Sequence, residues 1–182
     1  MAYVYLHHAF SMTVACRVMI VASLVLLPAV ASATEELLKE SVLSAGMAGK
    51  AIQASLEACR KDGYHVSVSV VDQAGVLRAM VRADGAGPHT IDSSRKKAYA
   101  AASLHRPTTE LAELINKVPT LQALREVNDQ MLILGGGLPI EIGGEVVGGI
   151  GVGGAPGAHL DDACAQAGLD AIGAAPKIRT TK

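Results

Sequence analysis

The sequence predicts an α+β domain in which helices flank an antiparallel β-sheet. Its predicted elements run in the order helix, two strands, helices, three strands and a final helix. The strands come as hairpins, and the chain lacks the repeated strand–helix–strand alternation that indicates a parallel sheet. For a chain of 182 residues without an internal repeat or a linker, one domain is expected.

A signal peptide is predicted ahead of this domain, in residues 1–33. This stretch has no acidic residue, and an apolar run in it is followed by Ala31-Ser32-Ala33, the small-x-small pattern that signal peptidase cleaves. Cleavage leaves Thr34 first and places the protein in the periplasm or outside the cell, with membrane contact only during export. The apolar run is shorter than the roughly 20 residues of a membrane span. An uncleaved anchor over residues 12–30 is the alternative, and translation from Met12 is a further hypothesis.

Residues 34–182 carry the domain, and its first predicted element is a long amphipathic helix. Apolar residues recur at three- and four-residue steps over residues 35–61. Residues 65–71 then alternate polar and apolar side chains, and residues 76–82 resume the apolar pattern. The turn between them carries Asp and Gly, so the two segments predict a β-hairpin.

Helices fill the middle of the sequence. Residues 91–103 are Ala-rich with a helical pattern, and Pro107-Thr108 opens a helix through Asn116, with Thr108 as its expected N-cap. A short helix is expected over residues 120–126.

The last third returns to strands. Short apolar strands separated by glycine turns are predicted in residues 131–134, 138–142 and 145–152. The final helix is expected to begin with Asp161 or Asp162 as its N-cap and to end near Ile172.

Composition and motifs exclude several functions. A net charge of -1 gives no reason to expect nucleic acid as a partner, and an aromatic share of 3% leaves no stacking platform. Residues 149–154 match the dinucleotide-binding pattern G-x-G-x-x-G, but no second strand completes the βαβ unit. We interpret these glycines as residues that let a strand pack tightly and turn.

Metal and nucleophile signals are few. The chain has no H-x-x-x-H pair, no C-x-x-C and no G-x-S-x-G elbow, so no preformed zinc site and no catalytic residue is predicted. His89 is the best candidate histidine, because it follows a Gly- and Pro-rich loop at the entrance to a helix. Any metal ligand stays unassigned.

One basic cluster, Arg95-Lys96-Lys97, lies in the middle helix. Three successive helical residues spread over roughly 200°, so they cannot share one face. The cluster is either a solvated surface or a source of one contact, from Arg95 or Lys97, to an acidic ligand. Tyr99 lies one turn beyond Arg95 and either lines a flat cofactor or fills core space.

The two cysteines of the domain, Cys59 and Cys164, both lie on apolar helix stripes. If the first and last helices pack together, the sulfurs can meet, and export favours their oxidation. The alternative is a pair of buried free thiols that act as small apolar residues.

Several segments together carry a family resemblance. They are Val68-Ser69-Val70-Val71-Asp72 with Gly75, Arg82-Ala83-Asp84-Gly85-Ala86, Lys97-Ala98-Tyr99-Ala100-Ala101, Arg106-Pro107-Thr108, Gly136-Gly137-Leu138-Pro139-Ile140, residues 147–156, Asp161-Asp162 and Ala167-Gly168. In this order they resemble the GlcG/HbpS-like family, also called the haem-degrading or DUF336 domain.

The resemblance implies a profilin-like domain with a five-stranded antiparallel sheet flanked by helices. It also implies haem as the cofactor, because secreted members bind haem and assemble into symmetric oligomers, some with slow haem degradation. Thr108 matches the family's R-P-T segment and Lys97 its helix lysine, whereas His89 occupies a variable loop.

We therefore expect an exported haem-binding homo-oligomer that acts in haem scavenging, storage, sensing or slow degradation. Cofactor contacts are expected from five residues on or near the Ala-rich helix, namely His89, Arg95, Lys97, Tyr99 and Thr108. The alternatives are an enzyme or enzyme accessory that binds a small organic acid, and a structural oligomer whose Ala- and Gly-rich helix faces serve assembly.

Overall fold

The structure is a computed structural model that describes residues 37–174, and the predicted signal peptide lies outside these residues. The chain divides into two units, Met1–Leu38 and Lys39–Lys182. All the elements below belong to the second unit. They are α1 (Ala45–Lys61), β1 (Ser67–Asp72), β2 (Leu77–Arg82), α2 (His89–Leu104), α3 (Thr108–Lys117), the 3-10 helix η1 (Pro119–Arg125), β3 (Gly137–Ile142), β4 (Glu145–Gly153) and α4 (Ala158–Ala171).

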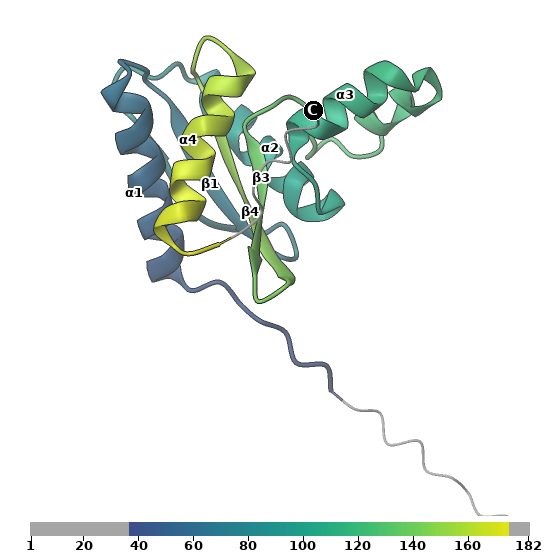
Figure 1. Ribbon diagram of the computed structural model, residues 1–182, viewed down its shortest axis with the longest axis horizontal. Coiled ribbons are helices and arrows are strands. Elements are labelled where there is room, and N and C mark those ends of the chain that lie inside the picture. Colours follow the sequence, from purple (N-terminus) through teal and green to yellow (C-terminus); the bar gives the residue numbers. More distant parts are fainter. Residues whose placement is uncertain (1–36, 175–182) are drawn as a thin grey trace, which may run out of the picture. The chain divides into compact units, whose positions relative to one another are not determined.

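Four strands form one antiparallel sheet in the order β2-β1-β4-β3. The helices α1 and α4 lie side by side over one face of this sheet, and α2 covers the other face (Figure 1). The α+β class and the antiparallel sheet are therefore confirmed. The described part of the chain has four strands instead of five, and the profilin-like topology stays a prediction.

The strand predicted over residues 131–134 is wrong. Ile133 is buried against Leu111 and Ile115 of α3, and the backbone N–H of Leu132 donates to the carbonyl oxygen of Lys96 in α2 at 3.2 Å. Because this backbone bonds to a helix and not to a strand, the apolar run joins the core without joining the sheet.

Two helix starts also differ from the prediction. The first helix begins at Ala45 instead of residue 35, because the Ser44 hydroxyl accepts a hydrogen bond from the backbone N–H of Met47 and caps it there. The last helix begins at Ala158, after Gly157 as N-cap. The two aspartates expected as its cap therefore lie inside the helix, where both are buried.

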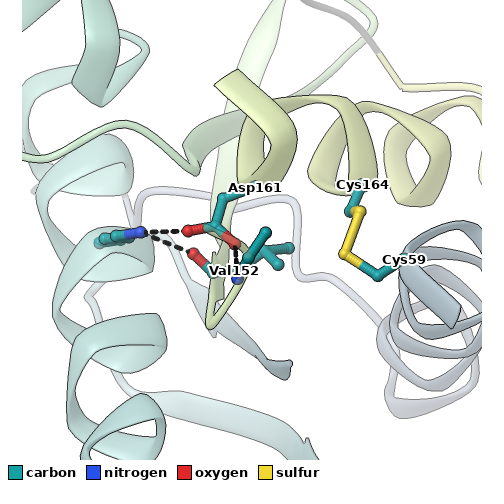
Figure 2. The surroundings of a disulfide bond; sticks show 6 residues. Cys59, Val152, Asp161 and Cys164 are labelled. Atoms are coloured by element: carbon teal, nitrogen blue, oxygen red, sulfur yellow. Dashed lines mark hydrogen bonds and ion pairs between the residues drawn. A yellow bond between two sulfur atoms is a disulfide. The ribbon is translucent and has the colours of Figure 1, made fainter. Parts of the chain in front are cut away.

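The main core lies between the sheet and the α1–α4 layer. Alternate residues of β1, such as Val68 and Val70, face this layer and pack with small side chains of both helices. Within this core, Cys59 of α1 and Cys164 of α4 form a disulfide with a Cα–Cα distance of 5.5 Å (Figure 2). Of the two alternatives for these cysteines, the structure shows the bonded pair.

Candidate functional site

Glycines of β4 allow α2 to approach the sheet closely. Gly149, Gly151 and Gly153 alternate along the strand and face α2. A Cβ atom on Gly151 would stand 2.0 Å from the carbonyl oxygen of Ser94 in α2. The interpretation of the G-x-G-x-x-G segment as packing glycines is thus confirmed.

The alanines of α2 complete this close contact. Ala98, Ala101 and Ala102 are buried, and Val71 of β1 packs against two of them. The Ala-rich surface that was expected to face a porphyrin therefore packs on the protein's own sheet. The same finding removes this helix face from the structural-oligomer alternative, because it is already covered.

Two buried hydroxyl pairs connect α2 to β1. The hydroxyl of Ser67 lies 2.6 Å from that of Thr90, and the hydroxyl of Ser69 lies 2.8 Å from that of Ser94. Ser67 and Ser69 are two residues apart on the strand, and their partners are one turn apart on the helix. The pairs therefore fix which side of α2 faces the sheet.

Lys97 lies in the interior on the β3 side of α2. Its Nζ donates to Oδ2 of Asp161 at 2.8 Å and to the carbonyl oxygen of Val152 at 2.9 Å, and the other carboxylate oxygen accepts from the backbone N–H of Ala155 at 3.0 Å (Figure 2). The two charged side chains are 2% and 5% exposed. This ion pair ties α2 to β4 and to α4.

The environment of Asp161 shifts its titration. Burial raises the pKa of this carboxyl above its ordinary value, and the Lys97 charge and hydrogen bond act against that shift. Such a pair holds elements together, and both of its side chains are almost fully buried.

A second buried contact joins the start of α3 to the entry of β3. The backbone N–H of Gly137 donates to the hydroxyl of Thr108 at 2.9 Å, and the backbone N–H of Gly136 donates to Oδ1 of Asp162 at 2.5 Å. Thr109 donates to the same carboxylate. The expectation that Thr108 caps its helix is wrong, because its hydroxyl makes these strand contacts and no side-chain cap bond is present there. We refer to Lys97, Thr108, Thr109, Asp161 and Asp162 as the Lys97 cluster.

Arg95, the first residue of the basic cluster, lies on the side of α2 opposite Lys97. Ser94 points at the sheet, so Arg95 lies about 100° around the helix in one direction and Lys97 about 60° in the other. Ile91, Arg95 and Tyr99 follow each other at four-residue steps and share this side. The Tyr99 ring lies against Gly75 of the β1–β2 turn, where a Cβ atom would stand 2.5 Å from ring carbon Cε2.

The edge strand β2 adds side chains on the α2 side of the sheet. In the antiparallel register Met80 lies opposite Ser69 and Arg82 opposite Ser67, the two serines that bond to α2. Residues paired across strands share a face. Leu77, which is 43% exposed, pairs with Val71 and faces the same way. We call this part of the molecule the β2–α2 surface, which consists of Leu77, Met80, Arg82, Ile91, Arg95 and Tyr99.

The predicted cofactor residues thus fall into separate places. Arg95 and Tyr99 come together on the β2–α2 surface, whereas Lys97 and Thr108 belong to the buried Lys97 cluster. His89 is exposed at the start of α2, about 120° around the helix from Arg95, and its ring folds over Gly87. A hollow of about 380 Å³ near Gln73 and His105 includes none of these five residues.

Asp161, Asp162 and Arg82 were not predicted as site residues from the sequence. A signal for the aspartates was present, because a lysine in an Ala-rich helix needs a carboxylate partner if it is buried. The register that places Arg82 beside α2 has no comparable local signal.

In residues 37–174 no group of three His, Cys, Asp or Glu side chains is arranged to hold a metal ion. No helix in the same range is long and apolar enough to cross a bilayer.

Comparison with known proteins places the chain among related sequences. A family model described as "Haem degrading protein HbpS-like" matches residues 43–170. Protein GlcG of Escherichia coli K12 is 33% identical over 111 residues, which are 61% of this chain and 81% of GlcG. A double mutant of Streptomyces reticuli HbpS is 42% identical with a TM-score of 0.70, over 78% of this chain and 94% of that one. A PduOC–haem complex is 25% identical with a TM-score of 0.69, over 74% of this chain and 98% of that one.

Proposed function

Because the chain belongs to the HbpS-like family of haem-degrading proteins, we propose that it is an exported haem-binding protein. The observation that carries this proposal is the combination of that membership with a related fold that was solved as a haem complex. The relatives support haem as the ligand to test, and the residues of this chain support one surface as its binding place.

The β2–α2 surface fits the chemistry of haem. A porphyrin needs apolar contact, cations for its propionates and an axial donor. Leu77, Met80 and Ile91 offer apolar contact, Arg95 offers a cation, and the phenol of Tyr99 or the thioether of Met80 is a donor type that haem proteins use. Haem, when bound, supplies an iron centre, while these side chains bind and orient the ring.

Of the residues predicted to contact haem, we propose that Arg95 and Tyr99 do so, whereas Lys97 and Thr108 position other groups. The ammonium group of Lys97 already has two oxygen partners in the interior, and the hydroxyl of Thr108 is bonded to β3. Because both side chains are buried, neither group reaches a ligand on the β2–α2 surface.

The disulfide supports export. Disulfides persist in oxidising compartments such as the periplasm and are rare in the cytosol. Cys59 and Cys164 are bonded and buried. We propose that the protein is exported with cleavage before Thr34, and N-terminal sequencing of the protein from a periplasmic or culture fraction tests this. Recovery of uncleaved chain in the membrane fraction favours the anchor alternative.

The β2–α2 surface supports the proposal that the protein forms a homo-oligomer. The β2–α2 surface would cover one face of a flat ring, so we propose that a second copy covers the other face in a homo-oligomer. Such a protein acts in haem scavenging, storage or sensing, with slow degradation as a secondary activity.

Titration with hemin tests the haem proposal. We expect a saturable Soret shift at micromolar hemin, and we expect Leu77→Asp to weaken binding at least about 10-fold because it places a charge under the ring. Val42→Asp is the matched control, since Val42 is 67% exposed and stands just before α1, which covers the other face of the sheet. Absence of a Soret shift in the oxidised wild-type protein refutes haem binding. Thermal stabilisation by small organic acids, without a response to hemin, supports the organic-acid alternative instead.

A further inference from the structure

We infer that two arginines on the β2–α2 surface, Arg82 and Arg95, form a clamp for a ligand with two carboxylates. This inference deepens the proposed function, because it names the carboxylates, and not the iron, as the main source of haem recognition at this surface. The ligand class is an apolar ring with a pair of carboxylates on one edge, as in an iron or iron-free porphyrin.

The sheet register places Arg82 on the α2 side. Arg82 is opposite Ser67, and the hydroxyl of Ser67 contacts Thr90 in the first turn of α2. One guanidinium nitrogen, Nη1, donates to the carbonyl oxygen of Ala86 at 2.8 Å in the loop before α2. A guanidinium carries five N–H donors, so this bond orients the group and leaves further donors for a ligand.

Helical geometry places Arg95 on the neighbouring flank. It follows Ser94, which contacts β1, and it turns to the side opposite the buried Lys97. Its side chain is 30% exposed, with Gln130 as a hydrogen-bond partner. Asp92 stands 4.0 Å away but is 76% exposed, so this ion pair is weak and a ligand carboxylate can replace it.

The two arginines lie at one end of an apolar surface. Along β2, Met80 is two residues from Arg82, which is a separation of about 6.8 Å on the strand. Along α2, Tyr99 is one turn beyond Arg95, toward the β1–β2 turn. Arg82 therefore lies beside the first turn of α2 and Arg95 about one turn farther along, and Met80, Leu77 and Tyr99 extend from them toward that turn.

This arrangement matches the polarity of a porphyrin. Its two propionates leave from one edge, and the rest of the ring is apolar. Arginine binds a carboxylate through two parallel hydrogen bonds, so one arginine can hold each propionate. A ligand with a single carboxylate, or with none, leaves one or both arginines unused.

Three porphyrins separate the contribution of the carboxylates from that of the iron. Hemin, iron-free protoporphyrin IX and hemin dimethyl ester are titrated into the oxidised full domain, with absorbance and intrinsic porphyrin fluorescence as readouts. We expect protoporphyrin IX to bind within about 10-fold of hemin, and the ester, which lacks both negative charges, to bind at least about 10-fold more weakly.

Arginine variants show which residues cause the difference in affinity between hemin and its dimethyl ester. We expect Arg82→Gln and Arg95→Gln each to raise the hemin Kd about 5- to 20-fold, the range for a charge-assisted bond at a half-exposed site. In the double variant, hemin and its ester should bind equally. Arg60→Gln, an exposed arginine of α1 on the other face of the sheet, is the matched control and should bind hemin as the wild type does.

Because Arg82 also bonds to the loop before α2, Arg82→Gln could weaken binding by disturbing that loop. A second variant separates this effect from the loss of a ligand contact. Arg82→Lys retains the positive charge and loses the two-pronged geometry, so a Kd between wild type and Arg82→Gln is expected if both proteins unfold at the same urea concentration. Equal binding of hemin and its ester by the wild-type protein overturns the clamp while haem binding stands. If none of the three porphyrins binds, the clamp and the proposed function both fail.

Discussion

Neutralising one partner of the buried ion pair gives the sharpest test of the structure. Asp161→Asn keeps the size of the side chain and an oxygen that can accept from the N–H of Ala155, but it removes the negative charge beside Lys97. At 2.8 Å and an effective dielectric constant of about 20, the lost Coulomb attraction is about 6 kcal/mol. Part of this is recovered because the carboxylate no longer has to be desolvated, but the amide nitrogen of Asn then faces the Lys97 ammonium, which stays buried with one acceptor fewer, so we expect a net loss of about 3–5 kcal/mol in unfolding free energy.

Urea unfolding of the oxidised protein measures this loss. With a slope of about 2 kcal/mol per molar urea, the midpoint should fall by about 1.5–2.5 M. Lys117→Met is the matched control, because Lys117 and Glu113 stand 4.0 Å apart with side chains 74% and 56% exposed. We expect less than about 1 kcal/mol there. If Asp161→Asn costs no more than this control, the buried pair does not hold α2 and the reasoning is refuted.

The pH dependence of Lys97→Met checks the sign of the same electrostatics. Because the pKa of Asp161 is raised in the folded protein, folding favours the protonated carboxyl. The stability that this group contributes is complete at pH values below its ordinary pKa and is lost as pH rises through the raised pKa of the folded state. Removing Lys97 removes the charge and the hydrogen bond that lower the pKa of Asp161. The destabilisation by Lys97→Met should therefore be large near about pH 8 and shrink toward about pH 4. Asp161→Asn should not show that recovery, since its lysine stays charged; equal pH profiles would contradict the assignment.

Three further outcomes follow from the packing. Reducing the bond between Cys59 and Cys164 should lower the unfolding free energy by about 2–5 kcal/mol, and equal urea midpoints with and without reductant would contradict this. Gly151→Ala should cost at least about 3 kcal/mol or yield insoluble protein, because its Cβ would meet the backbone of Ser94, and a midpoint like that of the wild type would show that α2 does not lie so close. Gly49→Ala, in the helix α1 with no atom near the new methyl group, should raise the unfolding free energy by about 0.5–1 kcal/mol in the same assay, and a lowered midpoint would indicate hidden contacts.

Local patterns predicted those elements whose partners lie next to them in the sequence. The β1–β2 hairpin follows from alternation on both sides of a turn with Asp72 and Gly75, and the turn is closed by a bond from the N–H of Val76 to the Asp72 carboxylate. Residues 131–134 carry a similar apolar signal but bond to α2. A run of four apolar residues says that a segment is buried and leaves open which element covers it.

The candidate site was only partly predictable for a related reason. The rule that Arg95 and Lys97 point to different sides of a helix is correct, yet it does not say which side meets the sheet. That choice depends on Ser69 and Gly151, which lie far away in sequence and contact Ser94 only after folding. Long-range contacts of this kind bury Lys97, which matches the family motif, and leave Arg95 partly exposed.

The small size of the residues between α2 and the sheet explains why a buried charge is useful there. Glycine and alanine surfaces are smooth, so packing alone does little to prevent α2 from sliding or rotating on β4. A buried ion pair is weak support for stability compared with apolar replacements, but it is strongly directional. The contacts of Lys97 with Val152 and Asp161 favour one rotation of the helix, and in that rotation Arg95 and Tyr99 face the β2 side. The proposed ligand surface on one flank of α2 therefore depends on charges buried on the other flank, which contact no ligand themselves.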